Sequence, residues 1–194
     1  FSQFINLFNR YSKRKLRDHN SLLIQLAQAP VIGLLLGFLF TNSGGEFRGL
    51  EIPAALEKIP VLIDLLQLQN GIHPTLFLIS AASFWLGSSN VARVLVSGRA
   101  IFLREKRAGL RSSAYLMAIF TYQVLLCMIQ TLLISGFVAF YVDLSAPFFN
   151  VWGLLILTGA SGISIGLLIS SFSKTEIAAI SFIPIILIPQ LMLA

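Results

Sequence analysis

This sequence has little charge, one cysteine and two histidines. Only 11% of its 194 residues are Asp, Glu, Lys or Arg, whereas 56% are hydrophobic, and the mean hydropathy is +0.84. A soluble domain needs a more polar surface, so this composition excludes the soluble class and indicates an integral membrane protein. The single cysteine, Cys127, lies within an apolar run. That position excludes an internal disulfide framework and a cysteine metal site.

The sequence also lacks the patterns on which membrane enzymes and ion-coupled transporters depend. It contains no Gly-x-x-x-x-Gly-Lys-Ser/Thr phosphate loop, no His-Glu-x-x-His and no Gly-x-Ser-x-Gly. His19 and His73 lie at the boundaries of apolar runs, and every acid lies outside these runs. Proton or sodium coupling usually places an acid inside a span. We therefore expect no catalytic site, metal or cofactor in this chain, and an energy source for any transport elsewhere.

Five apolar runs are separated by polar segments. Crossing a hydrocarbon core of about 30 Å takes about 20 helical residues, which is the scale of these runs. The glycine pairs Gly33-x-x-x-Gly37 and Gly162-x-x-x-Gly166 offer flat surfaces for close packing between helices. The sequence therefore predicts an all-α integral membrane protein, a helical bundle with spans at about 21–41, 74–92, 113–142, 149–171 and 177–194.

Two basic segments flank these runs. In residues 1–20, apolar side chains recur at helical spacing and basic side chains take other faces, which predicts an amphipathic helix in the membrane interface. A helix packed on another domain is the alternative. In residues 98–111, five basic residues accompany the single acid Glu105, so the segment cannot lie in a bilayer core. Its apolar residues predict a short amphipathic helix at one membrane face.

The basic residues also predict the orientation. Twelve of the 14 lie before Asn20, between Arg93 and Arg111, or at Lys174, and basic connections favour the cytosol. Residues 42–72 hold four acids and two bases, which suits the outer face and short surface helices. We expect the N-terminus and residues 98–111 to be cytosolic, in a plasma or inner membrane. The net charge of +6 comes from the basic residues that orient the chain in the membrane. We therefore expect no nucleic-acid partner.

The order of these features resembles a known family. A basic amphipathic helix precedes the first span, and Tyr115 opens a long uncharged third span. Between the second and third spans lies the pattern Arg99-x-x-Phe102-x-Arg104-Glu105-x-x-x-Gly109. Over essentially the whole chain this resembles the membrane domain of type-2 ABC exporters of the G subfamily, bacterial or eukaryotic half-transporters. Such domains have six spans, so the resemblance implies a sixth span beyond the end of this chain.

The resemblance implies roles for particular residues. The helix at 1–20 would connect an upstream ATPase domain to the transmembrane domain at 21–194. Residues 98–111 would be the coupling segment docked on the ATPase, through Phe102, Arg104, Glu105 and Gly109. The family forms its pathway from the second and fifth spans, where the candidates are Phe77, Ser80, Phe84 and Phe182. Ordinary helix packing is the alternative for each of these four.

The third span carries two glutamines, Gln123 and Gln130, seven residues apart and on one side of the helix. Amide side chains inside a membrane commonly form hydrogen bonds with neighbouring helices. Packing is therefore the favoured role for both glutamines. A place on the substrate pathway is the alternative.

We therefore expect the transmembrane domain of an ATP-driven exporter, which forms with a second copy a pathway for a lipid-like or amphipathic substrate. ATP and Mg would bind in the partner ABC ATPase domain, on the same polypeptide or a separate subunit, and membrane lipid would surround the spans. The alternative is a non-transporting scaffold that recruits a cytosolic partner through residues 98–111. An ATPase domain encoded upstream of Phe1 would favour the exporter, and a signalling domain alone would favour the scaffold.

Overall fold

The computed structural model describes residues 2–46, 73–142 and 147–192, and within these ranges the chain is helical with short turns. The predicted surface helices of residues 42–72 lie largely outside them. The helices are α1 (Ser2–Arg17), α2 (His19–Glu46), α4 (His73–Ala92), α5 (Val94–Arg107), α6 (Ser112–Tyr141), α7 (Phe148–Phe172) and α8 (Glu176–Met192). The predicted all-α fold is confirmed.

Four stretches of the described chain are long and apolar enough to cross a membrane: His19–Phe40, Thr75–Arg107, Ser112–Tyr141 and Phe148–Phe172. They cover most of each of the first four predicted spans, but the second stretch continues past the predicted end at residue 92 to Arg107. α8 occupies the place of the fifth and is a shorter apolar helix. Its 17 residues extend about 25 Å at 1.5 Å per residue, somewhat less than a hydrocarbon core of about 30 Å. The fifth span stays a prediction.

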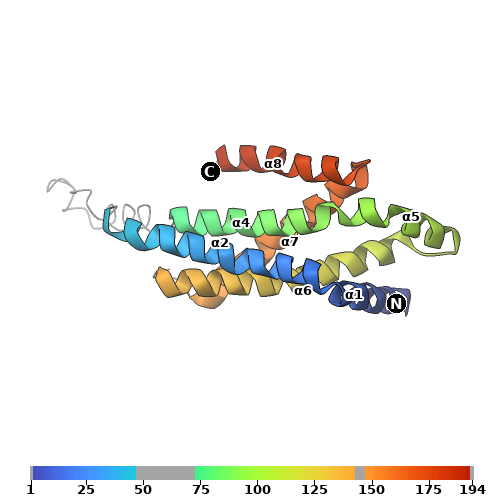
Figure 1. The fold of residues 1–194 in the computed structure, drawn as a ribbon, viewed down its shortest axis with the longest axis horizontal. Helices are drawn as coiled ribbons and strands as arrows, with labels where there is room; N and C mark the ends of the chain where they lie inside the picture. Colours follow the sequence, from blue (N-terminus) through green and yellow to red (C-terminus); the bar gives the residue numbers. More distant parts are fainter. Residues whose placement is uncertain (1, 47–72, 143–146, 193–194) are drawn as a thin grey trace.

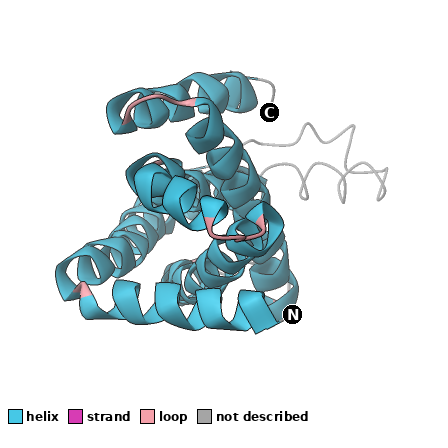
Figure 2. Cartoon of the chain, turned by 90° about the vertical axis from the view of Figure 1, so that its right-hand side faces the viewer, coloured by secondary structure: helices cyan, strands magenta, loops and turns pink. Residues whose placement is uncertain are grey.

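The long helices run side by side along the long axis of the molecule (Figure 1). α1 instead lies crosswise at one end of the bundle, where Figure 2 shows it running across the view below the other helices. α5 extends beyond α4 at the same end. Every basic residue that the structure describes lies on α1, on α5 or in a junction next to these helices or to the α7–α8 turn. We call α1, α5 and the α7–α8 turn the basic end.

Glycines bring α4 and α7 into backbone contact. A Cβ atom added to Gly166 would lie 2.6 Å from the carbonyl oxygen of Ser88, and one added to Gly162 would collide with that of Phe84. Real Cβ atoms essentially never come this close to another atom, so only glycine fits at positions 162 and 166 while α4 and α7 are this close together. The prediction that Gly162 and Gly166 form a helix-packing surface is confirmed, and its partner is α4.

The other predicted glycine pair packs α2 against α6. A Cβ atom on Gly33 would lie 3.0 Å from Cβ of Phe137, and one on Gly37 would lie 2.7 Å from the ring of Tyr141. α8 is attached differently, through an apolar cluster that joins α4, α7 and α8 and consists of Phe84, Ala92, Ile169, Ala179, Ile183 and Leu187. The bundle therefore has a tightly packed α4–α7 centre with α2 and α6 on one side and α8 on another.

Candidate functional site

α5 extends a membrane span and is not a separate helix between two loops. Only Arg93, with φ −87° and ψ −18°, separates it from α4, and these angles lie in the helical region. A straight helix over 73–107 would be about 50 Å long, which exceeds a hydrocarbon core of about 30 Å. α5 begins at Val94, before the predicted start at residue 98. A displacement of α5 therefore acts directly on the span to which it is joined.

Gly109 ends α5. Its N–H donates to the carbonyl of Lys106 at 3.1 Å, and the N–H of Leu110 donates to that of Glu105 at 3.1 Å. This pair of bonds is the Schellman arrangement that closes many helices. The φ of Gly109 is +93°, in the left-handed region where glycine has no Cβ penalty. The glycine thus lets the chain reverse into α6, while its predicted contact with an ATPase stays a prediction.

Two of the predicted coupling residues face helices of their own chain. The ring of Phe102 lies 4.8 Å from that of Tyr115 on α6, between centroids. Oε2 of Glu105 accepts a hydrogen bond of 2.6 Å from Nη2 of Arg10 on α1. The side chains of Arg10 and Glu105 are 51% and 20% exposed. Water screens a pair of this kind, so it stabilises the fold by at most about 1 kcal/mol.

The outer surface of α5 is apolar and cationic. Leu103, Arg104, Lys106 and Arg107 are exposed there, and Gly109 is exposed in the turn that follows. Nζ of Lys106 also lies 5.9 Å from the centre of the Phe102 ring, within the range of a cation–π contact. Of the predicted coupling residues, Arg104 and Gly109 are thus accessible to a partner, and Phe102 and Glu105 are partly covered.

Arg99 attaches α5 to the end of α7. Its Nη2 donates hydrogen bonds to the carbonyl oxygens of Ser171 at 3.2 Å and Ser173 at 2.9 Å. The last carbonyls of a helix have no partner within the helix, and a cation at this position also interacts favourably with the helix dipole. The backbone N–H of Leu95 donates to Oγ of Ser170 at 3.1 Å. α5 is therefore joined to α7 by hydrogen bonds, to α1 by an ion pair and to α6 by an aromatic contact.

A cavity of about 260 Å³ lies between α1, α5 and α6. Its charged wall consists of Arg10, Arg14 and Lys15 of α1 and of Asp18, which lies between α1 and α2. Its apolar wall includes Val94 and Ile101 of α5 and Ala118 and Ile119 of α6. The sequence did not predict this cavity, because its walls come from segments that are about 80 to 100 residues apart.

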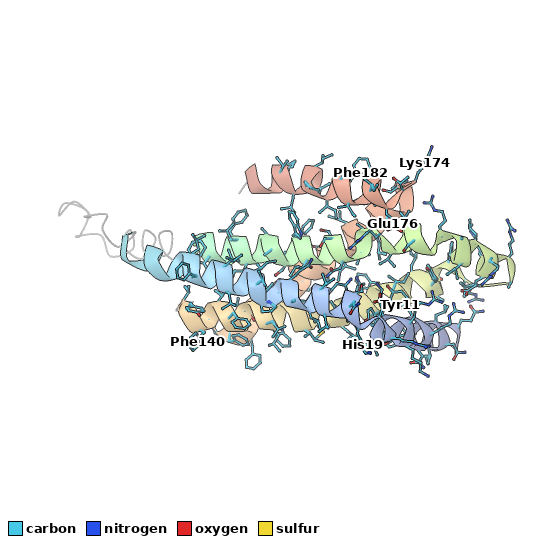
Figure 3. All side chains as sticks on the ribbon, in the orientation of Figure 1. Tyr11, His19, Phe140, Lys174, Glu176 and Phe182 are labelled. Atoms are coloured by element: carbon cyan, nitrogen blue, oxygen red, sulfur yellow. The ribbon has the colours of Figure 1, made fainter. Side chains whose placement is uncertain are left out.

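Tyr11 lies in the wall of this cavity, between α1 and α6 (Figure 3). Its ring meets that of Tyr122 edge-on, with centroids 5.2 Å apart. Among the residues that the structure describes, its buried hydroxyl has no hydrogen-bond partner. Such a group costs about 1–3 kcal/mol. Burial raises the pKa of Tyr11, and the nearby Tyr115 and Tyr122 raise it further.

A comparison of the sequence with models of protein families assigns the chain to a family. A sequence model of ABC-2 type transporters matches residues 2–194. The chain belongs to the ABC-2 type transporter family. It is thus a membrane component of an ABC transporter, a permease rather than a catalytic subunit, and this confirms the ABC-2 part of the predicted resemblance. No curated protein matches the sequence.

The predicted pathway residues of this ABC-2 membrane domain differ in their surroundings. Phe84 is 5% exposed and packs in the cluster between α4, α7 and α8. Phe77 and Ser80, on the same helix, are partly buried, whereas Phe182 on α8 is 49% exposed. The contact of Phe84 agrees with ordinary helix packing. A role for any of the four in a pathway stays a prediction.

Gln130 joins three helices of the ABC-2 domain. Its Nε2 donates to the carbonyl oxygen of Gln25 on α2 at 2.7 Å, and its Oε1 accepts from Nδ2 of Asn90 on α4 at 3.1 Å. The side chain is fully buried, and Gln123 is only 3% exposed. Such hydrogen bonds between helices are the packing role expected of polar residues in membranes. Sequence reasoning missed Asn90, which has no distinctive local pattern.

Metal chemistry finds no support in the described part of the ABC-2 domain. Within residues 2–46, 73–142 and 147–192, no three His, Cys, Asp or Glu side chains gather where they could hold a metal ion. The acidic side chain of Asp18 has a structural role, since its Oδ1 accepts a hydrogen bond of 3.3 Å from the N–H of Ser21 and so caps the start of α2.

Proposed function

We propose that this ABC-2 domain is the transmembrane half of an ATP-driven exporter similar to the G subfamily. Two copies would surround a pathway for a lipid-like or amphipathic substrate, and an ABC ATPase domain that binds ATP and Mg would drive them. The observation that supports this best is α5, which extends one span and is bonded to α1, α6 and α7. A helix fixed in this way can pass a force from its exposed surface into the whole bundle.

The basic end faces the cytosol in this proposal, in a plasma or inner membrane. Support comes from the described basic residues, which gather at this end of the bundle, because basic connections favour the cytosol. The crosswise position of α1 (Figure 2) also suits a helix that lies along a membrane surface. An ATPase in the cytosol would meet the outer surface of α5 directly.

The coupling residues divide into two groups in this mechanism. Arg104 and Gly109, with the exposed side chains around them, form the contact that the ATPase displaces. Phe102 contacts Tyr115 of α6, and Glu105 forms an ion pair with Arg10 of α1. Displacement of α5 therefore moves these two helices. Arg99 carries the same movement to α7. The pathway would open beside α4 and α8, where the candidates are Phe77, Ser80, Phe84 and Phe182.

The test is ATPase activity of the full-length parent protein in lipid vesicles, compared between the wild type and a Phe102→Ala, Glu105→Arg variant. We expect the variant to lose substrate-stimulated activity while it remains folded by gel filtration. A Lys13→Ala, Arg17→Glu variant, on exposed positions of α1, is a control for altered surface charge and should retain activity. Unchanged activity in the first variant would contradict the coupling role. Absence of ATPase activity both from the parent protein alone and from the parent protein with its co-purified subunits would favour the scaffold.

A further inference from the structure

The cavity between α1, α5 and α6 has more cationic than anionic groups on its charged wall. Arg10, Arg14 and Lys15 line it together with one acid, Asp18. Glu105 neutralises Arg10 from outside this cavity, and Asp18 uses one carboxylate oxygen to cap α2. The side chain of Arg14 is exposed and has no hydrogen bond or ion pair to any residue that the structure describes. Two cations, Arg14 and Lys15, thus face a single acid that is already engaged.

Lys15 shows the consequence of this imbalance. It is partly buried on α1, and burial lowers its pKa. Asp18 acts in the opposite direction, and the positive charge of Arg93 lowers the pKa of Lys15 further. A partly buried ammonium group next to another cation is stabilised by an anion from outside the chain. The arrangement therefore favours an anionic ligand.

The remaining wall suits the apolar part of a lipid. Val94, Ile101, Ala118 and Ile119 form it, and Ala118 and Ile119 lie about 10 Å along α6 from its first residue at 1.5 Å per residue. In a membrane that α6 enters at its first residue, this is the depth of the interface between headgroups and acyl chains. Leu116 and Met117, on the same turn of α6, are 40% and 60% exposed but do not line the cavity.

We propose that this cavity binds the phosphate group of an anionic membrane phospholipid. Arg14 presents a planar guanidinium that can bind two phosphate oxygens at once, and Lys15 adds a point charge. The apolar wall contacts the glycerol backbone and the first carbons of the chains. A lipid bound here touches α1, α5 and α6 together, so it stabilises the attachment of α5. The inference does not depend on an ATPase partner.

The experiment measures the thermal stability of the full-length protein in neutral detergent micelles. Phosphatidylglycerol, phosphatidylcholine or inorganic phosphate is added to separate samples. We expect phosphatidylglycerol to raise the melting temperature in a saturable way, and the other two to have little effect. In an Arg14→Gln, Lys15→Gln variant, the apparent affinity for phosphatidylglycerol should fall at least about tenfold, because each cation near an anionic headgroup contributes on the order of 1 kcal/mol.

The matched control is Lys13→Gln, Arg17→Gln, which removes the same charge from exposed positions of α1 that do not line the cavity. Equal loss of affinity in both variants would show unspecific attraction and overturn the site. An Arg14→Lys, Lys15→Arg variant keeps both charges and should keep the response, and a cooperative melting transition of the Gln variant without lipid shows that it is folded. Equal stabilisation by inorganic phosphate would support the anion chemistry and overturn the lipid as its source.

Discussion

Nη2 of Arg99 lies 2.9 Å from the carbonyl oxygen of Ser173, so a side chain of α5 closes the end of α7. These residues are 74 positions apart in the sequence. The bond fills a carbonyl that helix geometry leaves without a partner. It also makes the α7–α8 turn sensitive to the position of α5. The same helix contacts α6 through Phe102 and α1 through Glu105.

Substitution of Arg99 should therefore weaken the bundle. Arg99→Ala removes two hydrogen bonds from a charged donor, so we expect the free energy of unfolding to fall by about 1–3 kcal/mol. Unfolding of the full-length protein in mixed micelles measures this. Arg107→Ala, an exposed arginine on the same helix, should change the value by less than about 0.5 kcal/mol. Equal effects of the two substitutions would contradict the role of Arg99.

The ion pair between Arg10 and Glu105 should be weak but specific. A double-mutant cycle with Arg10→Ala and Glu105→Ala should give a coupling free energy of about 0.5–1 kcal/mol, because the pair is partly exposed. The exchange Arg10→Glu with Glu105→Arg should recover part of this stability, and high salt should reduce the coupling. The same cycle with Arg17 in place of Arg10 is the control. Additive effects of the Arg10 and Glu105 substitutions would show that α1 and α5 are held by other contacts.

Tyr11 should make stability depend on alkaline pH. Its pKa in the folded protein is raised above the ordinary value of 10.0, mainly by burial. The folded state therefore favours the neutral phenol, and the corresponding stability is present below pH 10 and lost as the pH rises above it. Tyr11→Phe removes the ionisable group, so the melting temperature should fall less steeply above pH 10 than in the wild type.

At neutral pH the same substitution tests the buried hydroxyl. Tyr11→Phe removes a polar group without a partner among the described residues, so stability should be unchanged or rise by about 1 kcal/mol. Tyr141→Phe, at an exposed position, is the control and should leave the neutral-pH stability unchanged. A loss of more than 1 kcal/mol in Tyr11→Phe would show that the hydroxyl has a partner.

Two glycines of α7 should respond to alanine in opposite ways. A Cβ atom at Gly162 would collide with the backbone of Phe84, so Gly162→Ala should destabilise the protein by about 1–3 kcal/mol through forced separation of the helices. A Cβ atom at Gly153 meets nothing within 4 Å. Gly153→Ala should therefore be neutral or stabilise by up to about 1 kcal/mol, because alanine favours the helix. The comparison can be made by unfolding in micelles.

Much of the fold follows from local sequence. Long uncharged runs with charged ends predict the positions of α2, α4, α6 and α7, since a polar backbone in lipid must form helices. The spacing of Gly162 and Gly166 predicts a packing surface for the same local reason. The glycine at 109, just after three basic residues, coincides with the helix end that such a pattern favours. These features depend on neighbouring residues only.

The contacts of the site could not be predicted in this way. The amphipathic pattern of residues 98–111 shows an apolar and a charged face, but it does not show that Tyr115 and Arg10 cover Phe102 and Glu105. Gln130 bonds to Gln25, 105 residues away, and no periodicity reveals such a partner. The cavity at α1 depends on the angle at which a crosswise helix meets two others. Each case requires knowledge of tertiary packing.

The contact of α4 with α7 through bare backbone has a mechanical consequence. Side chains can change rotamer and so absorb a small displacement, whereas backbone atoms already in van der Waals contact cannot. The α4–α7 pair therefore has low compliance, and strain applied to α4 by α5 reaches α7 with little loss. The interfaces between helices that deform more easily are those filled by side chains, such as the cluster of Phe84, Ile183 and Leu187 between α4 and α8. Deformation during a transport cycle should concentrate there.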